Sequence, residues 1–279
     1  MGNESKKALK SSDGLELHSA SWTVPNPKLN VCIVHGLGEH CGRYAHVAEF
    51  YNGIGANVYA LDFRGHGQSK GARGCGPDLN AFLDDVDALI YYMKEDSKDL
   101  PWIFHSHSMG GNIGLNHVIR RKSDCSAIIA TGPWITIENT PSKGLVFVAN
   151  LINKFGGFTQ SSEIDATYVS TDKEEVNKYL NDPLIHDKIS SKAGMSLYHS
   201  GQYLYSYKEG MPIPTLVLHA KKDKLTLASG SEAFARNNES NVTLQIFDDV
   251  YHELHNDVKR AELFECIKTW LKTNQIFSK

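Results

Sequence analysis

Residues 102–111 read WIFHSHSMGG, and this stretch decides the fold. A short apolar run that breaks into a small-residue turn and then a helical pattern predicts a strand, a tight turn and a helix. Such a turn presents one side chain at its apex, as in the motif G-x-S-x-G, and that side chain is Ser108 here. The first glycine of the motif is replaced by Ser106. We expect Ser108 to be an exposed nucleophile at the carboxyl end of a parallel strand, and Ser106 to be a small residue tolerated in a crowded turn.

Strand and helix patterns alternate on both sides of this stretch. The expected strands cover residues 15–24, 31–34, 57–61, 102–105, 127–131, 215–219 and 242–247, and the expected helices cover 43–54, 78–98, 109–121, 229–237 and 257–272. This alternation predicts an α/β fold with a mostly parallel sheet and helices on both faces. A chain of 279 residues is long enough for one sizeable core.

The alternation is lost between residues 134 and 205, where glycines and prolines interrupt helical fragments. The sequence therefore predicts a core formed by residues 1–133 and 206–279, with residues 134–205 inserted as a helical cap, or lid, over the site. Residues 144–155 are the most apolar part of this insertion. Two interpretations stay open for them: a buried cap helix, or a lid that faces lipid at a membrane surface.

Composition excludes several classes of protein. A formal net charge of −3 argues against nucleic-acid binding, which usually relies on a basic surface. Five scattered cysteines without C-x-x-C spacing indicate reduced thiols of a cytoplasmic protein. Residues 1–7 lack the apolar segment of a secretory signal, and Lys6 stands where N-myristoylation requires Ser or Thr. No apolar run approaches the roughly 18 residues of a membrane span.

The thirteen histidines include no H-E-x-x-H pattern, so we expect no metal site. The glycines of residues 36–38 and 65–67 do not form a phosphate-binding pattern, and no cofactor is expected. His35, His40 and His66 are interpreted as hydrogen-bonding residues of the scaffold. The aspartates Asp84, Asp85 and Asp87 are interpreted as a solvated helix face.

A serine hydroxyl needs a base to take its proton and a third group to orient that base. On an α/β-hydrolase sheet the three groups occur in the order Ser, Asp or Glu, His. Asp223 and His252 each follow an expected strand, and the carboxyl ends of parallel strands meet at one edge. Asp248 and Asp249 remain alternatives for the acid, and His255 remains an alternative for the base.

Three motifs now point to a family. Residues 35–40 (HGLGEH), 62–69 (DFRGHGQS) and 107–111 (HSMGG) resemble the serial motifs of the monoacylglycerol lipase family. This is a branch of the α/β-hydrolases that also includes lysophospholipase-like members. Asp182-Pro183, Asp223 and Tyr251-His252 follow in the family's order, and the resemblance spans about residues 15–270.

The resemblance implies a role for each matching residue. Ser108 would attack an ester carbonyl, and His252 would act as base and then as acid, oriented by Asp223. The backbone N–H groups of Leu37 and Met109 would form the oxyanion hole. The polar residues expected at the alcohol end of the pocket, for substrate binding, are Glu39, Arg43, Tyr44, His107 and His255.

The implied activity is cleavage of lipid carboxylic esters, with monoacylglycerol first, through an acyl-enzyme on Ser108. A lysophospholipase, a thioesterase and a general carboxylesterase stay open because the same catalytic residues serve all three. A non-catalytic scaffold of the same fold is a remote alternative. The expected partner is a lipid ester, with peripheral membrane contact through the cap, whereas the oligomeric state stays open.

Overall fold

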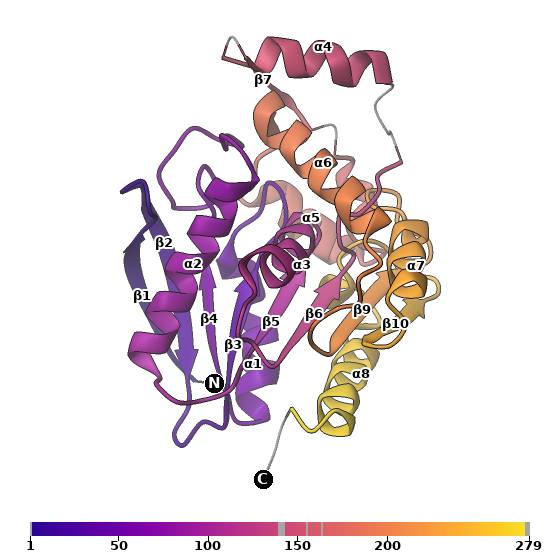
Figure 1. Cartoon of the computed structure of the whole chain (residues 1–279). Helices are drawn as coiled ribbons and strands as arrows, with labels where there is room; N and C mark the ends of the chain where they lie inside the picture. Colours follow the sequence, from indigo (N-terminus) through magenta and orange to yellow (C-terminus); the bar gives the residue numbers. More distant parts are fainter. Residues whose placement is uncertain (1, 139–142, 155, 163, 277–279) are drawn as a thin grey trace.

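The computed structural model describes residues 2–138, 143–154, 156–162 and 164–276. A central sheet has the strand order β1-β2-β4-β3-β5-β6-β9-β10 (Figure 1). Its strands are β1 (Asn3–Lys10), β2 (Glu16–Thr23), β3 (Leu29–Val34), β4 (Ala56–Leu61), β5 (Trp102–His107), β6 (Ala127–Thr131), β9 (Thr215–Ala220) and β10 (Val242–Phe247). β1 and β2 run antiparallel to their neighbours, and the pairs from β4 to β10 are parallel. The prediction of a mostly parallel sheet is therefore confirmed.

The outer strand β1 was not among the strands expected from sequence. It pairs with β2 along its whole length, from Asn3 opposite Thr23 to Lys10 opposite Glu16. All of its side chains except Leu9 are exposed, so the strand lacks the apolar alternation that identifies a half-buried strand. Its conformation comes from pairing with β2, which the local sequence does not reveal.

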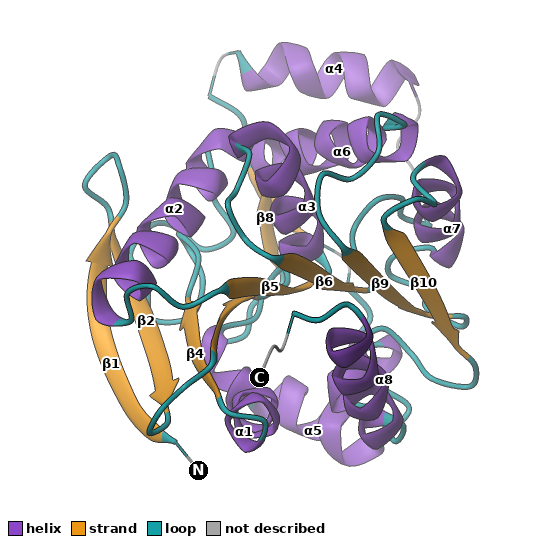
Figure 2. Ribbon diagram, turned by 60° about the horizontal axis from the view of Figure 1, so that its bottom comes forward, coloured by secondary structure: helices purple, strands orange, loops and turns teal. Residues whose placement is uncertain are grey.

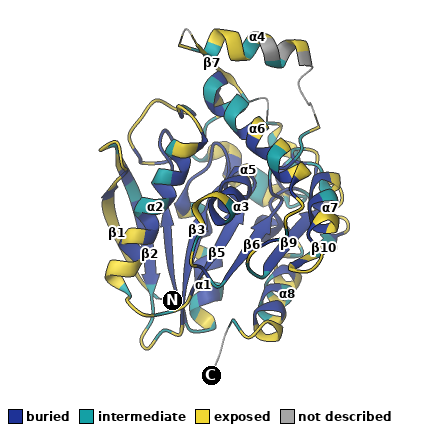
Figure 3. Ribbon diagram, in the orientation of Figure 1, coloured by how far each residue is buried: buried dark blue, intermediate teal, exposed yellow. Residues whose placement is uncertain are grey.

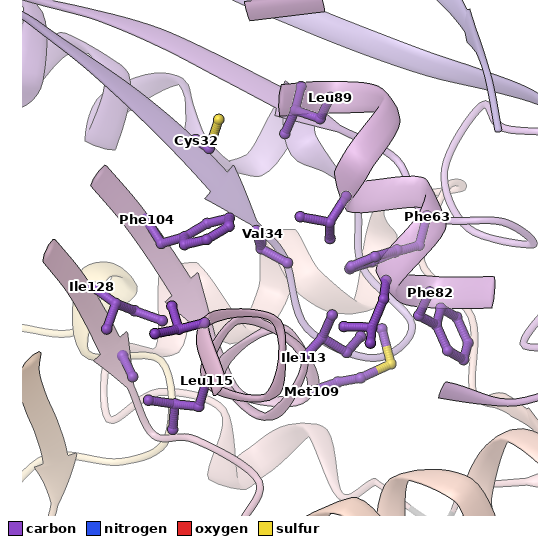
Figure 4. Close-up of a cluster of buried hydrophobic side chains, with 14 of the residues drawn as sticks. Cys32, Val34, Phe63, Phe82, Leu89, Phe104, Met109, Ile113, Leu115 and Ile128 are labelled. Carbon is purple, nitrogen blue, oxygen red and sulfur yellow. The ribbon is translucent and has the colours of Figure 1, made fainter. Parts of the chain in front are cut away.

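Helices cover both faces of the sheet (Figure 2). On one face lie α2 (Leu79–Asp96), α3 (Met109–Arg121), α6 (Ser191–Ser206) and α7 (Ala228–Asn237), and on the other lie α1 (Ala45–Gly53) and α8 (Arg260–Thr273). The strand residues alternate between two hydrophobic cores because successive side chains point to opposite faces. In β3, Cys32 and Val34 join the first core, whereas Val31 and Ile33 join the second. Figure 4 shows part of the first core, where Phe104 and Ile128 meet residues of α3.

Helix α2 begins as expected, because Asp78 caps it by accepting a hydrogen bond from the Ala81 N–H at 3.0 Å. The interpretation of its aspartates as a solvated face is wrong for Asp85. This residue is fully buried, and its two carboxylate oxygens accept hydrogen bonds from Arg64 Nε at 2.9 Å and Nη2 at 2.7 Å. Helical spacing places Asp85 near its neighbours along the chain but does not show that Arg64 lies beneath it.

The cap segment, residues 134–205, connects β6 to the core strand β9. It contains α4 (Lys143–Asn153), the short strands β7 (Thr159–Ser161) and β8 (Lys188–Ser190), the 3-10 helix η2 (Ala166–Tyr168), α5 (Lys173–Asn181) and most of α6. β7 and β8 pair antiparallel. The cap boundaries themselves stay a prediction.

Helix α4 stands farthest from the sheet, beyond α6 (Figure 1), and much of it is exposed (Figure 3). Val148 and Leu151 are each 48% exposed and Ile152 is 39% exposed, which does not fit a buried cap helix. Phe155, which ends the apolar stretch, lies outside the described residues. Within the described part of the chain, every helix is too short or too polar to cross a membrane.

Two further 3-10 helices lie in the connections that follow β3 and β10. They are η1 (Cys41–Tyr44), which precedes α1, and η3 (Leu254–Asn256), which precedes α8. Both lie close to the carboxyl ends of the parallel strands in sequence, and both carry residues described below.

Candidate active site

The turn after β5 has the geometry that its sequence predicts. Ser108 has φ of 55° and ψ of −117°, a left-handed region that a side chain enters at a cost of about 1–3 kcal/mol. Gly110 allows α3 to start against β3, because a Cβ there would lie 2.1 Å from the Val34 carbonyl oxygen. Ser108 is only 8% exposed, less than expected, because residues of the cap segment form the opposite wall of the cavity that it lines.

Ser106 is fully buried, and its Oγ donates a hydrogen bond to the Ile129 carbonyl oxygen at 3.0 Å. Gly114, one turn into α3, leaves room for the Ser106 side chain. A Cβ on Gly114 would lie 3.1 Å from both Cβ and Oγ of Ser106. The glycine missing from the turn is thus matched by a glycine on the facing helix.

Ser108, His252 and Asp223 form one chain of hydrogen bonds. Asp223 Oδ2 lies 2.6 Å from His252 Nδ1, and His252 Nε2 lies 2.8 Å from Ser108 Oγ. An ionised carboxylate only accepts hydrogen bonds, so Nδ1 carries the proton and Nε2 accepts from the serine hydroxyl. The alternative residues lie elsewhere: Asp248 pairs with Lys221, and Asp249 pairs with Lys222.

The surroundings of Asp223 hold it in its ionised form. The backbone N–H groups of Leu225 and Thr226 donate to Oδ1 at 2.8 and 3.0 Å, and the Thr226 hydroxyl donates to Oδ2 at 3.0 Å. Burial favours the neutral acid, yet His252 and His219 outweigh it and hold the pKa of Asp223 well below its usual range. Burial also disfavours a charged His252, but Asp223 outweighs it and raises the pKa of His252.

The loop that carries Leu37 runs beside Ser108. A Cβ on Gly36 would lie 3.1 Å from Ser108 Cβ, so only a glycine lets the loop approach this closely. Met109 is the first residue of α3, and its N–H points from an open helix start. Within the described residues, no hydrogen bond uses the N–H of Leu37 or of Met109. Within the described residues, both N–H groups are thus left for another acceptor.

The same loop is fastened to the cap segment. The His186 N–H donates to the Gly38 carbonyl oxygen at 2.9 Å, and a Cβ on Gly38 would lie 2.2 Å from the His186 carbonyl oxygen. Nearby, His40 Nε2 lies 2.9 Å from a carboxylate oxygen of Asp182. Residues 182–186 therefore hold the loop at Gly38 and at His40.

Glu39, Arg43 and Tyr44 form a buried network. Glu39 Oε1 accepts from the Gly36 N–H at 2.6 Å and from the Tyr44 hydroxyl at 2.7 Å, and Oε2 accepts from Arg43 Nη1 at 2.7 Å. Arg43 also makes a two-fold contact with Glu253, at 2.7 and 2.6 Å. The network connects the loop beside Ser108 to the residue that follows His252.

The His107 ring lies between those of His252 and His255, tilted against the first and edge-to-face with the second. The ring centres of His107 and His252 are 4.7 Å apart, and those of His107 and His255 are 4.8 Å apart. His107 Nδ1 donates to the Thr131 carbonyl oxygen at 3.0 Å, and burial, with His252 nearby, lowers the pKa of His107 to about 3. Burial and the neighbouring histidines likewise hold the pKa of His255 well below its usual value, so both rings are neutral.

A cavity of about 510 Å³ opens above Ser108. Its apolar lining includes Leu37, Trp134, Ile164, Val169, Ile189 and Met195. Of the five expected substrate-binding residues, Glu39 and His107 line it. Arg43, Tyr44 and His255 are absent from the lining described, and they lie in the layer behind it.

Two residues of the site were not expected from sequence. Glu253 lines the cavity and binds Arg43, and Thr226 holds the Asp223 carboxylate. Their only sequence signals are their positions, directly after His252 and three residues after Asp223. Position alone does not show that a carboxylate is buried and paired.

The histidines interpreted as scaffold make such contacts. His35 Nε2 accepts from the Phe63 N–H at 2.9 Å, and His66 Nδ1 donates to the Arg64 carbonyl oxygen at 3.0 Å. Scaffold hydrogen bonding is therefore confirmed for these two.

One group of side chains has the spacing of metal ligands. The ligand atoms of His18, Cys41 and Asp62 lie within 4.8 Å of one another. The Asp62 oxygens already accept from the backbone N–H groups of Cys41 at 2.7 Å and Gln68 at 2.8 Å. These contacts account for the buried carboxylate as a support of the loop after β4.

Comparison with known proteins shows the family to which the chain belongs. The family described as serine aminopeptidase, S33, matches residues 25–259. A monoacylglycerol lipase from Mycolicibacterium smegmatis is 34% identical over 253 residues, covering 90% of this chain and 90% of that protein. This chain belongs to the monoacylglycerol lipase family.

Two further lipases are similar to this chain in sequence or in structure. A monoglyceride lipase from Rattus norvegicus is 30% identical over 270 residues, covering 94% of this chain and 89% of that protein. The crystal structure of a monoacylglycerol lipase from Paleococcus ferrophilus has a TM-score of 0.83 at 29% identity, covering 93% of this chain and 99% of that one. The predictions of the family and of the α/β-hydrolase fold are thus confirmed, and the chain is an ester hydrolase of this fold.

Proposed function

We propose that this protein hydrolyses monoacylglycerols to a fatty acid and glycerol through an acyl-enzyme on Ser108. The observation that carries the proposal is the chain of short hydrogen bonds from Ser108 through His252 to the ionised Asp223. The largely apolar cavity above Ser108 suits an acyl chain, and its polar wall at Glu39 and His107 suits an alcohol.

In the proposed reaction, Ser108 Oγ attacks the ester carbonyl carbon while His252 Nε2 takes the hydroxyl proton. The carbonyl oxygen becomes negative, and the N–H groups of Leu37 and Met109 stabilise it, each donor contributing about 3–4 kcal/mol. The ester C–O bond then breaks, and His252 gives its proton to the departing alcohol oxygen. Water, deprotonated by His252, then attacks the acyl carbon. The bond to Ser108 Oγ breaks, the fatty acid leaves, and His252 returns its proton to Oγ.

The test is a hydrolysis profile across monoacylglycerols, lysophospholipids and acyl-CoAs that share one acyl chain, with Ser108→Ala as the control. We expect the highest kcat/KM for monoacylglycerol and loss of all turnover in the variant. A preference for the lysophospholipid or the acyl-CoA would favour a lysophospholipase or a thioesterase instead. A fluorophosphonate should label the wild type but not Ser108→Ala, and equal labelling of both would refute the role of Ser108. An inactive and unlabelled wild type would favour a scaffold.

The exposed residues of α4 support peripheral membrane contact by a cytoplasmic protein. Val148, Leu151 and Ile152 occur at helical spacing and are exposed together with Phe158. We expect the wild type to float with phosphatidylcholine vesicles and Leu151→Asp to float less. Tyr91→Asp, at a residue 69% exposed on α2, is the matched control and should float like the wild type. Equal flotation of both variants would count against this contact.

A further inference from the structure

Two buried carboxylates share the cavity wall near Ser108. Glu39 is 2% exposed and Glu253 is 3% exposed, and both line the cavity. Glu39 comes from the loop beside Ser108, and Glu253 directly follows His252. Lys224 also lines the cavity but is exposed to solvent, where its charge is screened.

Arg43 is the counter-ion of both carboxylates. It binds Glu39 through one contact and Glu253 through two. Its guanidinium also lies 5.0 Å from the centre of the ring of Tyr179, which lines the cavity. Burial favours the neutral acids, but Arg43 outweighs burial and lowers the pKa of both Glu39 and Glu253. Two carboxylates and one guanidinium leave this group with one excess negative charge, and His107 beside it is neutral.

We propose that Glu253 determines the charge of the alcohol that the enzyme accepts: neutral or cationic leaving groups enter this end of the cavity, and anionic ones are excluded. The inference rests on the proposed function, since it concerns the alcohol released from the same ester. A phosphate or carboxylate on that alcohol would meet a buried negative wall in a medium of low dielectric constant, where like charges repel strongly. Specificity would thus come from repulsion of the wrong substrate.

Glu253 is the residue that can be changed without releasing the loop. Glu39 holds the Gly36 N–H and the Tyr44 hydroxyl, so its removal would disturb the backbone next to Leu37. Among the described residues, the Glu253 carboxylate accepts hydrogen bonds from the side chains of Arg43 and Asn256. In Glu253→Gln, Arg43 stays paired with Glu39, and the group becomes neutral.

The experiment compares kcat/KM for three esters of one fatty acid: the monoacylglycerol, the monoacylglycerol 3-phosphate and the choline ester. The proteins are the wild type, Glu253→Gln and Glu253→Asp, which keeps the charge but shortens the side chain. We expect the wild type to discriminate against the phosphate ester. Glu253→Gln should reduce this discrimination on the order of tenfold and should lower relative activity on the choline ester. Glu253→Asp should keep the preferences of the wild type.

A purely structural role of Glu253 predicts a different pattern. It would lower kcat/KM for the three esters by the same factor, in Glu253→Asp as well as in Glu253→Gln, and this result would overturn the inference. Unchanged ratios in Glu253→Gln would also overturn it. A wild type that hydrolyses the three esters equally contradicts only this inference, whereas one that hydrolyses none of them contradicts the proposed function.

Discussion

The contact between Ser106 and Gly114 gives a prediction in which overpacking and helix propensity oppose each other. Replacing Gly114 with Ala adds a methyl group 3.1 Å from both Cβ and Oγ of Ser106 and 3.2 Å from Ile128 Cδ1. Overpacking of this kind costs about 1–3 kcal/mol. The same change gains about 1 kcal/mol of helix propensity, because Gly114 lies in the interior of α3. The single variant is therefore expected to lose up to about 2 kcal/mol of unfolding free energy.

The double variant separates the two effects. Ser106→Gly removes two of the three close contacts, so Gly114→Ala should become stabilising by about 1 kcal/mol in that background. Ser106→Gly alone should cost about 1–2 kcal/mol, from the lost hydrogen bond to Ile129 and the flexibility of glycine in a strand. The coupling between the two sites is then about 1–3 kcal/mol.

The measurement is urea unfolding of the wild type, both single variants and the double variant, followed by circular dichroism. Ser106→Ala is the matched control, because it keeps Cβ but removes Oγ, and its coupling to Gly114→Ala should be smaller but present. Effects that add within about 0.5 kcal/mol would show that the two residues do not contact each other, and the explanation of Ser106 would fall.

Three further predictions concern charged groups. His252 must be neutral to accept a proton, and its pKa is raised, so kcat/KM of the wild type should fall on the acidic side of a pH that lies above 6.5. Asp223→Asn removes the partner that raises this pKa and should move the acidic fall of kcat/KM to lower pH, whereas an unchanged pH profile would contradict the assignment. Asp85→Leu leaves the Arg64 guanidinium buried without its main partner and should cost about 3–5 kcal/mol in urea unfolding. Asp84→Leu, at a partly exposed residue of the same helix, should cost within about 1 kcal/mol, and equal losses would refute the difference in burial. Asp182→Asn weakens the contact with His40 and should lower kcat more than it changes KM, whereas a change in KM alone would place its effect on substrate entry.

The sequence predicted the parts of the fold that local patterns determine. The strand and helix around Ser108 follow from an apolar run, a small-residue turn and helical spacing, and their predicted bounds nearly match β5 and α3. The positions of Asp223 and His252 after expected strands, together with the family resemblance, pointed to the residues that meet Ser108, while Asp248, Asp249 and His255 stayed open as alternatives. For the strand, turn and helix around Ser108, the signal lies within a few residues of the feature.

Pairing over long distances in the chain was not predictable in this way. Strand β1 is polar and takes its conformation from β2, and Asp85 is buried because Arg64, 21 residues earlier, lies against it. Glu253 gave no sign of its contact with Arg43, which is 210 residues away in sequence. The match between Ser106 and Gly114 was also not evident, because it depends on how α3 packs on β5.

Because residues 182–186 are attached to the loop at Gly38, the two parts of the cap segment differ in how directly they affect the catalytic residues. Substitutions in α4 act on a part that stands apart from the chemistry, so variation there can change the entrance for substrates at little cost to turnover. Substitutions at the Asp182 end are expected to disturb the loop that carries Leu37, through the contacts with His40 and Gly38, and so to lower the rate itself. Engineering of the substrate range should therefore begin in α4 and leave residues 182–186 unaltered.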